Sequence, residues 1–306
     1  MTLTTATERT IDAVDAGAGL LRAALPAGRR GALAQELGLD YRPIDNEMMT
    51  AWGPGDYIRA ELNPLERRIW DLAYPDQGKR DDPPHAECVA YITLELCRLR
   101  RLDERERTIA VTAAICHDTG YASMPDIAYR FDAALHNKSE RGKRILYLQR
   151  IAHEKFGVAR TKGYFEQAIR DQPRAEDWLR SCCREACRII ERHDSRGYAD
   201  RSEIPPLAAF VWDADRIYRV LVPECRVRYE GKNRKSLADL FVKLDTCAAP
   251  DNYLLRESLA IARLELANTM LTIHEERARA GAREELPQSF LRAYAGEISC
   301  LRRGLR

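Results

Sequence analysis

The sequence predicts an all-α protein. Apolar residues recur at helical spacing along most of the 306 residues, and no segment alternates apolar and polar side chains over the length of a strand. Prolines and polar turns separate these periodic stretches, and we find no internal repeat. We therefore expect a helical bundle over residues 61–225, a helical extension before it over residues 1–60, and a second extension, packed on the bundle, over residues 226–306.

The composition is that of a soluble protein with nearly balanced charge. Hydrophobic residues make up 45% and charged residues 31% of the chain, and 49 basic against 47 acidic side chains leave a formal charge of +2. This balance argues against a nucleic-acid-binding protein, although it leaves room for a local basic pocket. Nine cysteines without a Cys-x-x-Cys motif favour a reduced, cytoplasmic protein. We see no signal peptide and no stretch of about 20 apolar residues, so we expect no contact with a membrane.

The elements of the first third are predicted from apolar spacing and from turns. Residues 10–25 and 30–37 form helical patches in an Ala/Gly-rich segment. Residues 62–74 have helical spacing, and the polar, proline-containing turn 75–84 ends that helix. Two prolines just before His85 suit a helix start, so we expect the next helix to begin there.

The stretch 109–121 is the most informative part of the chain. Its apolar run predicts a helix that is buried on every side, and this run ends in His117 and Asp118, followed by Gly120. Burying an imidazole and a carboxylate is costly unless something pairs with them. A bound cation is the natural partner, and the alternative is a chance His-Asp pair at a helix terminus.

The rest of the bundle is predicted to contain three more helices. Helical spacing marks residues 139–153, 176–192 and 207–222. The charged stretch 154–174 between the first two carries three aromatic residues, so we expect it to pack against the body.

The last predicted elements follow a basic loop. Residues 226–235 are the densest basic run of the chain, which is either solvated or able to close over an anionic substrate. Helices are then expected over residues 237–244, 253–277 and 287–302. These C-terminal helices either complete the bundle or form the surface of a homo-oligomer.

Histidines and aspartates occur at or near the ends of successive predicted helices, and this order resembles the HD-domain superfamily of metal-dependent phosphohydrolases. Imidazole and carboxylate together suit divalent metals such as Fe, Mn, Ni, Co, Zn or Mg. The resemblance covers roughly residues 75–222. It rests on His85 and on three segments: Ala114-Ile-Cys-His-Asp-Thr-Gly, His136-Asn-Lys-Ser-Glu-Arg-Gly-Lys-Arg-Ile-Leu and Asp213-Ala-Asp-Arg-Ile. It identifies the bundle as an HD domain and says less about the substrate.

The resemblance also implies the ligands of a first metal ion, which are His85, His117, Asp118 and Asp215. Asp213 is the rival for the last position. Residues two apart on a helix face different sides, so only one of these two aspartates should point at the ion.

A second ion is implied by His136 and His193, which match positions of the binuclear branch of the superfamily, with Asp118 as the bridging ligand. We favour two ions, about 3.5–4 Å apart. The alternative is that these two histidines bind no ion and instead contact the substrate or the side chains of the metal ligands. His153 and His274 match nothing and are expected to be surface or packing residues.

The activity that the resemblance implies is hydrolysis of a nucleotide or another small phosphate ester by metal-activated water. Asp118 would act at the metal, and Asp194 would orient the water or shuttle its proton, unless it is only a cap or an ion-pair partner. Cationic side chains near the ligands are expected to bind the anionic substrate, namely Lys138, Arg141, Arg196 and Arg216.

Two alternatives and one departure remain at this point. The superfamily also includes di-iron oxygenases of small polar substrates, which use the same His/Asp set, and a non-catalytic ligand-binding HD protein is a third possibility. Tyr121 stands three residues after His-Asp, a position where many members place a lysine. The sequence lacks the second-half signature of the cyclic-dinucleotide phosphodiesterases, and we find no (p)ppGpp synthetase module.

Overall fold

Helices and no strands form the described part of the protein, which confirms the predicted all-α fold. In this computed structural model, the described residues are 34–35, 38–44, 56–77, 85–124, 140–193, 203–230 and 234–303, and no strand occurs among them. The helices expected over residues 10–25 and over most of residues 30–37 lie outside these ranges.

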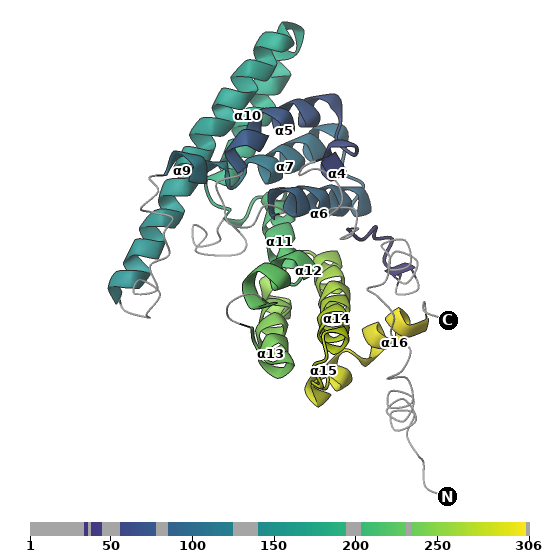
Figure 1. The fold of residues 1–306 in the computed structure, drawn as a ribbon. Coiled ribbons are helices and arrows are strands. Elements are labelled where there is room, and N and C mark those ends of the chain that lie inside the picture. The colour runs from purple at the N-terminus through teal and green to yellow at the C-terminus, as the bar shows by residue number, and fades with distance from the viewer. Residues whose placement is uncertain are drawn as a thin grey trace, which may run out of the picture.

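The bundle is built around one central helix, α7. Its helices are α4 (Asp56–Arg59), α5 (Pro64–Gln77), α6 (His85–Leu99), α7 (Glu104–Cys116), α9 (Glu140–Asp171) and α10 (Glu176–Ile190), with the short 3-10 helices η1 (Thr119–Ser123) and η2 (Pro173–Ala175). Helix α7 contacts α5, α6, α9 and α10. Figure 1 shows α9 and α10 as the two long helices along one edge of this bundle.

The local sequence explains both the start and the burial of α7. Asp103 and Glu106 form a capping box, in which each side chain accepts a hydrogen bond from the backbone N–H of the other residue. Every residue from Thr108 to Cys116 is buried. A helix surrounded on all sides needs apolar residues all round, as its sequence has.

Helix α9 is longer than predicted, because the charged stretch after His153 continues the same helix to Asp171. Tyr164 and Phe165 are buried in the core, and Arg160 forms an ion pair with Asp76 at the end of α5. The charges therefore lie on the outer face of a packed helix. The expectation that this stretch packs against the body is confirmed, whereas the expected break after His153 is wrong.

A C-terminal group of helices follows the bundle, and α11 lies between the two (Figure 1). Helix α11 contacts α6 and α7 of the bundle, and it also contacts α14. The elements are α11 (Ala208–Tyr218), α12 (Val222–Cys225), the π-helical turn η4 (Arg226–Glu230), α13 (Leu237–Cys247), η5 (Pro250–Asn252), α14 (Arg256–Arg279), α15 (Gln288–Ala293) and α16 (Ala295–Arg303).

Three arginines of the basic run 226–235 lie close to glutamates. Arg226 pairs with Glu276, Arg228 pairs with Glu224, and the nearest N···O distance between Arg234 and Glu230 is 4.0 Å. These contacts offset the positive charge of the run.

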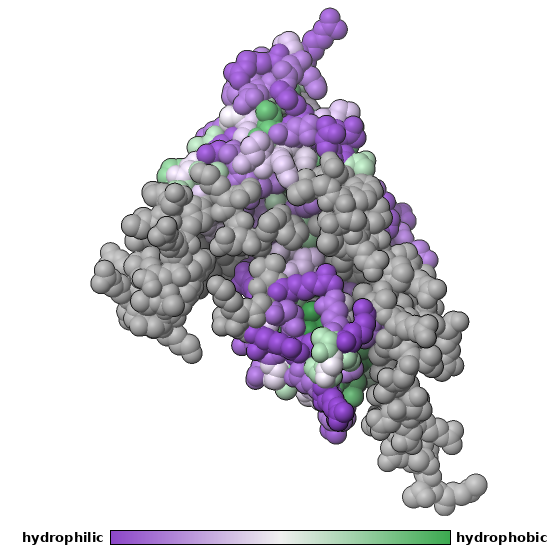
Figure 2. All heavy atoms as spheres, in the orientation of Figure 1, coloured by the Kyte–Doolittle hydropathy of each residue, from purple (hydrophilic) through white to green (hydrophobic). Residues whose placement is uncertain are grey.

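The surface gives no sign of a membrane-spanning element in the described ranges. None of the helices there combines the length and the apolar character needed to cross a bilayer. On the face drawn in Figure 2, the described residues are mainly hydrophilic, with small separate hydrophobic areas.

Candidate metal centre

Helix termini that are far apart in the sequence meet at one point of the fold. His85 is the first residue of α6, His117 directly follows α7, and His193 follows α10. Helices α6 and α7 are antiparallel neighbours joined by a short turn, so the start of one lies beside the end of the other. The imidazoles of these three residues are buried.

Two of these histidines are oriented by the same local device. The Nδ1 atom of His117 lies 2.7 Å from the carbonyl oxygen of Ala114, and that of His193 lies 2.8 Å from the carbonyl oxygen of Ile190. A carbonyl oxygen can only accept, so Nδ1 carries the proton and donates it. In the neutral imidazole this leaves a lone pair on Nε2, which is the atom that ligates a metal.

A first group of donors gathers around the Oδ2 atom of Asp118. This oxygen lies 3.0 Å from Nε2 of His85 and 3.3 Å from Nε2 of His117, and the two Nε2 atoms are 3.0 Å apart. The Oδ1 atom of Asp215 lies 3.5 Å from Nε2 of His85. Ligands about 2.0–2.2 Å from one ion lie roughly 3.0–3.5 Å from each other, so these donors fit a shared cation.

A second group of donors gathers around the other oxygen of Asp118. Its Oδ1 atom lies 3.5 Å from Nε2 of His193 and 3.6 Å from Nε2 of His153, and these two Nε2 atoms are 3.2 Å apart. All three residues offer ligand atoms within 4.8 Å of one another, as do His85, His117 and Asp118 in the first group. The Asp118 side chain is thus common to two groups that could each hold a metal ion.

His153, which we expected to be a surface or packing residue, lies at the candidate centre. Its imidazole is buried beside His193 and Asp118. No aspartate is adjacent to His153 in the sequence. The position of its imidazole depends on where α9 crosses the end of α7. One signal in the chain was Gly157, one helical turn further on, because a glycine within a helix often marks a close approach to another backbone.

The two candidate carboxylates of α11 have different surroundings. Asp213 accepts hydrogen bonds from the backbone N–H groups of Leu254 and Leu255 at 3.0 and 2.8 Å, just before α14 begins. Burial raises the pKa of Asp213. Asp215 has one oxygen near His85 and the other 2.9 Å from the Arg219 guanidinium. Between the rivals, the geometry therefore favours Asp215 as the ligand.

Arg216 is the only predicted substrate-binding side chain within the described part of the protein. Its guanidinium lies 3.8 Å from the ring centroid of Trp212 and donates to the Trp212 carbonyl oxygen at 3.2 Å. Burial lowers the pKa of Arg216 to about 10. These contacts are within α11 itself.

The remaining predicted site residues lie outside the described part of the chain. They are His136, Lys138, Asp194 and Arg196. Arg141 belongs to α9, but its side chain is not among the described parts.

The comparisons with known proteins agree with this site. Residues 85–219 match the family model of the HD domain, so this part of the chain belongs to the HD-domain superfamily. The match begins at His85 and ends at Arg219, and it spans both donor groups. No curated protein and no solved structure matches the chain. The matched segment is thus an HD domain, the domain of a superfamily of metal-dependent, hydrolase-type proteins, and it carries a candidate His/Asp metal centre.

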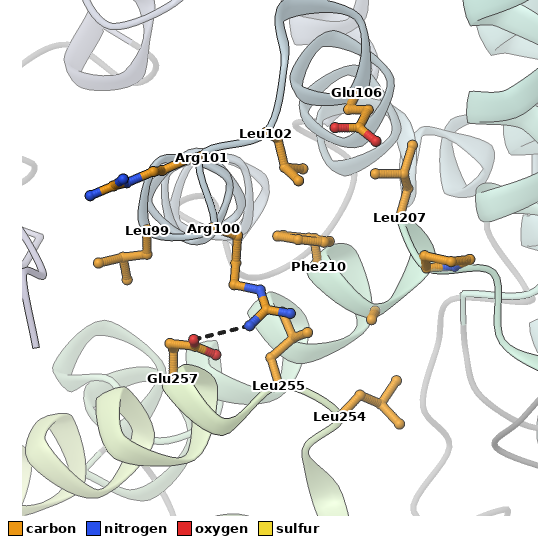
Figure 3. Close-up of a pocket in the computed structure, with 12 residues that line it drawn as sticks. Leu99, Arg100, Arg101, Leu102, Glu106, Leu207, Phe210, Leu254, Leu255 and Glu257 are labelled. Atoms are coloured by element: carbon orange, nitrogen blue, oxygen red, sulfur yellow. Dashed lines mark hydrogen bonds and ion pairs between the residues drawn. The ribbon is translucent and has the colours of Figure 1, made fainter.

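A separate cavity of about 510 Å³ lies at the other end of α6, where Leu99 and Arg100 line it together with Phe210 and Leu255. In the close-up of Figure 3, the Arg100 guanidinium points across the cavity to Glu257, and the N···O distance is 3.2 Å. Helix α6 places His85 about 21 Å from Leu99. The cavity is therefore distinct from the candidate metal centre.

Proposed function

We propose that this protein is a metal-dependent phosphohydrolase that acts on a nucleotide or another small phosphate ester. The observation that supports it is the position of Asp118, whose two oxygens each face a separate group of imidazoles. Such a carboxylate is suited to bridge two divalent ions. Bound there, the ions would supply activated water and charge that offsets the phosphate oxygens in the transition state.

The chain's own residues divide into two sets in this proposal. His85, His117 and Asp215 would hold the first ion, and His153 and His193 would hold the second. The Nδ1 hydrogen bonds of His117 and His193 fix the tautomer of the neutral imidazoles in which Nε2 carries the lone pair and is aimed at the centre. His136 remains a predicted ligand of the second ion, beside or in place of His153.

Positive charge and proton transfer are the other requirements of this chemistry. Arg219 is half-exposed and holds one oxygen of Asp215, so it keeps that carboxylate turned toward His85. Asp194 follows His193 directly and remains our candidate to orient the attacking water or move its proton. Arg216, Lys138, Arg141 and Arg196 remain the proposed contacts to the anionic substrate.

The test combines metal analysis with hydrolysis assays. Protein purified without chelators is analysed for metals, then stripped and reloaded with Mn, Ni, Co, Fe, Zn or Mg. Each form is assayed without oxygen on p-nitrophenyl phosphate and on a panel of nucleotides. We expect hydrolysis that depends on the metal, and a loss of at least about 100-fold in His117→Ala and in His193→Ala.

The metal content of the variants also shows how many ions the protein binds. His117→Ala should lose all bound metal, and His193→Ala should lose about half. An exposed control such as Arg180→Ala, which lies outside both donor groups, should change neither value. Full metal occupancy after His193→Ala would contradict the two-ion arrangement and leave a single-ion site.

Two other outcomes would replace the proposal. Oxygen uptake and a mixed-valence signal of the two-iron form, without hydrolysis, would identify a di-iron oxygenase. Bound metal with neither activity would favour a ligand-binding protein that keeps the HD scaffold.

A further inference from the structure

Tyr121 stacks on His153. The two ring centroids are 4.4 Å apart and the ring planes differ by 6°, so the phenol lies flat against the imidazole. The other edge of the same imidazole places Nε2 near His193 and Asp118. One face of His153 is therefore covered by Tyr121, and its Nε2 atom is turned to the candidate metal centre.

The backbone fixes Tyr121 relative to Asp118. The N–H of Tyr121 donates to the carbonyl oxygen of Asp118 at 3.1 Å, and the carbonyl of Tyr121 accepts from the N–H of Met124 at the same distance. The short helix η1 thus starts at the shared carboxylate and presents the phenol ring to α9.

Gly120 makes this contact possible. A Cβ atom at this position would lie 1.8 Å from the carbonyl oxygen of His153 and 2.5 Å from the backbone nitrogen of Gly157. Only glycine lets η1 approach α9 so closely, and it does so at the residue that carries the imidazole.

The χ2 torsion of a histidine has broad minima, because it joins sp³ and sp² atoms, so the contacts of the ring decide its orientation. These contacts include hydrogen bonds to carbonyl oxygens in His117 and His193, and the stacked Tyr121 ring in His153. We propose that Tyr121 is the positioning residue for the second ion: its ring holds the His153 imidazole in the plane that directs Nε2 to Asp118 and His193. This inference rests on the two-ion site of the proposed function.

The test uses Co²⁺ as the probe, because its visible absorption reports each binding step. Metal-free protein is titrated with Co²⁺ in the parent and in the variants Tyr121→Phe, Tyr121→Ala, His153→Ala and Tyr121→Ala/His153→Ala. Outer contacts of metal ligands are commonly worth about 10- to 100-fold in affinity. We expect Tyr121→Ala to weaken the second step by at least about 10-fold and leave the first unchanged. Tyr121→Phe, which keeps the ring, should restore the parent value.

The double variant separates positioning from a general packing effect. If Tyr121 acts through His153, its removal should cost nothing further once His153 is alanine. The first binding step reports on folding, since a variant that failed to fold would lose both steps. Equal second-step affinities in Tyr121→Ala and the parent would overturn the inference, and so would an unrestored value in Tyr121→Phe.

Failure of this inference differs from failure of the proposed function. Two Co²⁺ steps in the parent that are insensitive to Tyr121 would leave the two-ion hydrolase intact and remove only the positioning role. A single step in the parent, also unaffected by His153→Ala, would remove the second site itself.

Discussion

The Oδ2 atom of Asp118 lies 3.0 Å from Nε2 of His85, and this contact joins the end of α7 to the start of α6. The opposite oxygen of the same carboxylate faces the imidazoles of α9 and of the turn after α10. One side chain therefore connects every helix that contributes a histidine to the centre. Its removal should affect both donor groups, whereas the removal of His193 should affect only the second.

We expect Asp118→Asn to lose both metal ions. The amide keeps the shape of the side chain but replaces one oxygen donor with an NH2 group and removes the negative charge, so one group loses a ligand and the other keeps only a neutral oxygen. Elemental analysis should find metal near zero, against about half in His193→Ala. Asp171→Asn is a matched control, because Asp171 pairs with Arg68 on the exposed side of α9. Retention of one full ion in Asp118→Asn would show that the carboxylate does not bridge.

Asp213 and Asp215 form a matched pair for a second prediction. Asp213→Ala leaves the N–H groups of Leu254 and Leu255 without their acceptor, so it should lower the free energy of unfolding by about 2 kcal/mol. Its metal content should stay at the parent value. Asp215→Ala should show the reverse, with less bound metal and little change in urea denaturation when both proteins are compared in the metal-free form. If Asp213→Ala lost metal and Asp215→Ala lowered the free energy of unfolding, Asp213 would be the ligand.

The helices were predictable because their apolar spacing and turn residues are local signals. His85 begins α6 as the preceding prolines indicate, and the apolar run of α7 is buried all round. The end of α9 was not predictable in this way. Its charged outer face hides the fact that Tyr164 and Phe165 continue the buried side of the helix.

The site was predictable only where the chain places its donors in a recognisable pattern. His117 and Asp118 are adjacent, and Asp215 stands in an apolar helix. Each of these two features can be recognised in the sequence alone. His153 is an isolated histidine in the middle of a helix, and it reaches the centre only because Gly120 and Gly157 let η1 and α9 touch. That contact depends on tertiary packing, which no local spacing encodes.

Removal of the metal should destabilise the fold. Ions that bind only the native state stabilise it by mass action, by about 4 kcal/mol when the free ion is a thousandfold above its Kd. We expect a chelator to lower the Tm of the metal-loaded protein by at least about 5 °C, measured by differential scanning calorimetry. His117→Ala, which is expected to bind no metal, should show no such shift. An equal shift in that variant would mean that the chelator acts elsewhere.

Gly120→Ala tests the contact that brings η1 onto α9. The added Cβ cannot stay 1.8 Å from the His153 carbonyl oxygen, so the two backbones must separate. Overpacking of this kind typically costs about 1–3 kcal/mol, and the backbone clash here places the expected loss at the upper end. The separation also moves Tyr121 off the His153 ring, so the second Co²⁺ step should weaken more than the first.

Gly163→Ala is the matched control on the same helix, because a Cβ there meets nothing within 4 Å. Alanine favours a helix interior over glycine by up to about 1 kcal/mol, so this variant should be neutral or slightly more stable, with both Co²⁺ steps unchanged. Parallel urea denaturation and Co²⁺ titration of the two variants measure both effects. If Gly120→Ala matched Gly163→Ala in stability and in metal binding, the close approach of η1 to α9 would not hold in solution, and the route by which Tyr121 reaches His153 would be lost with it.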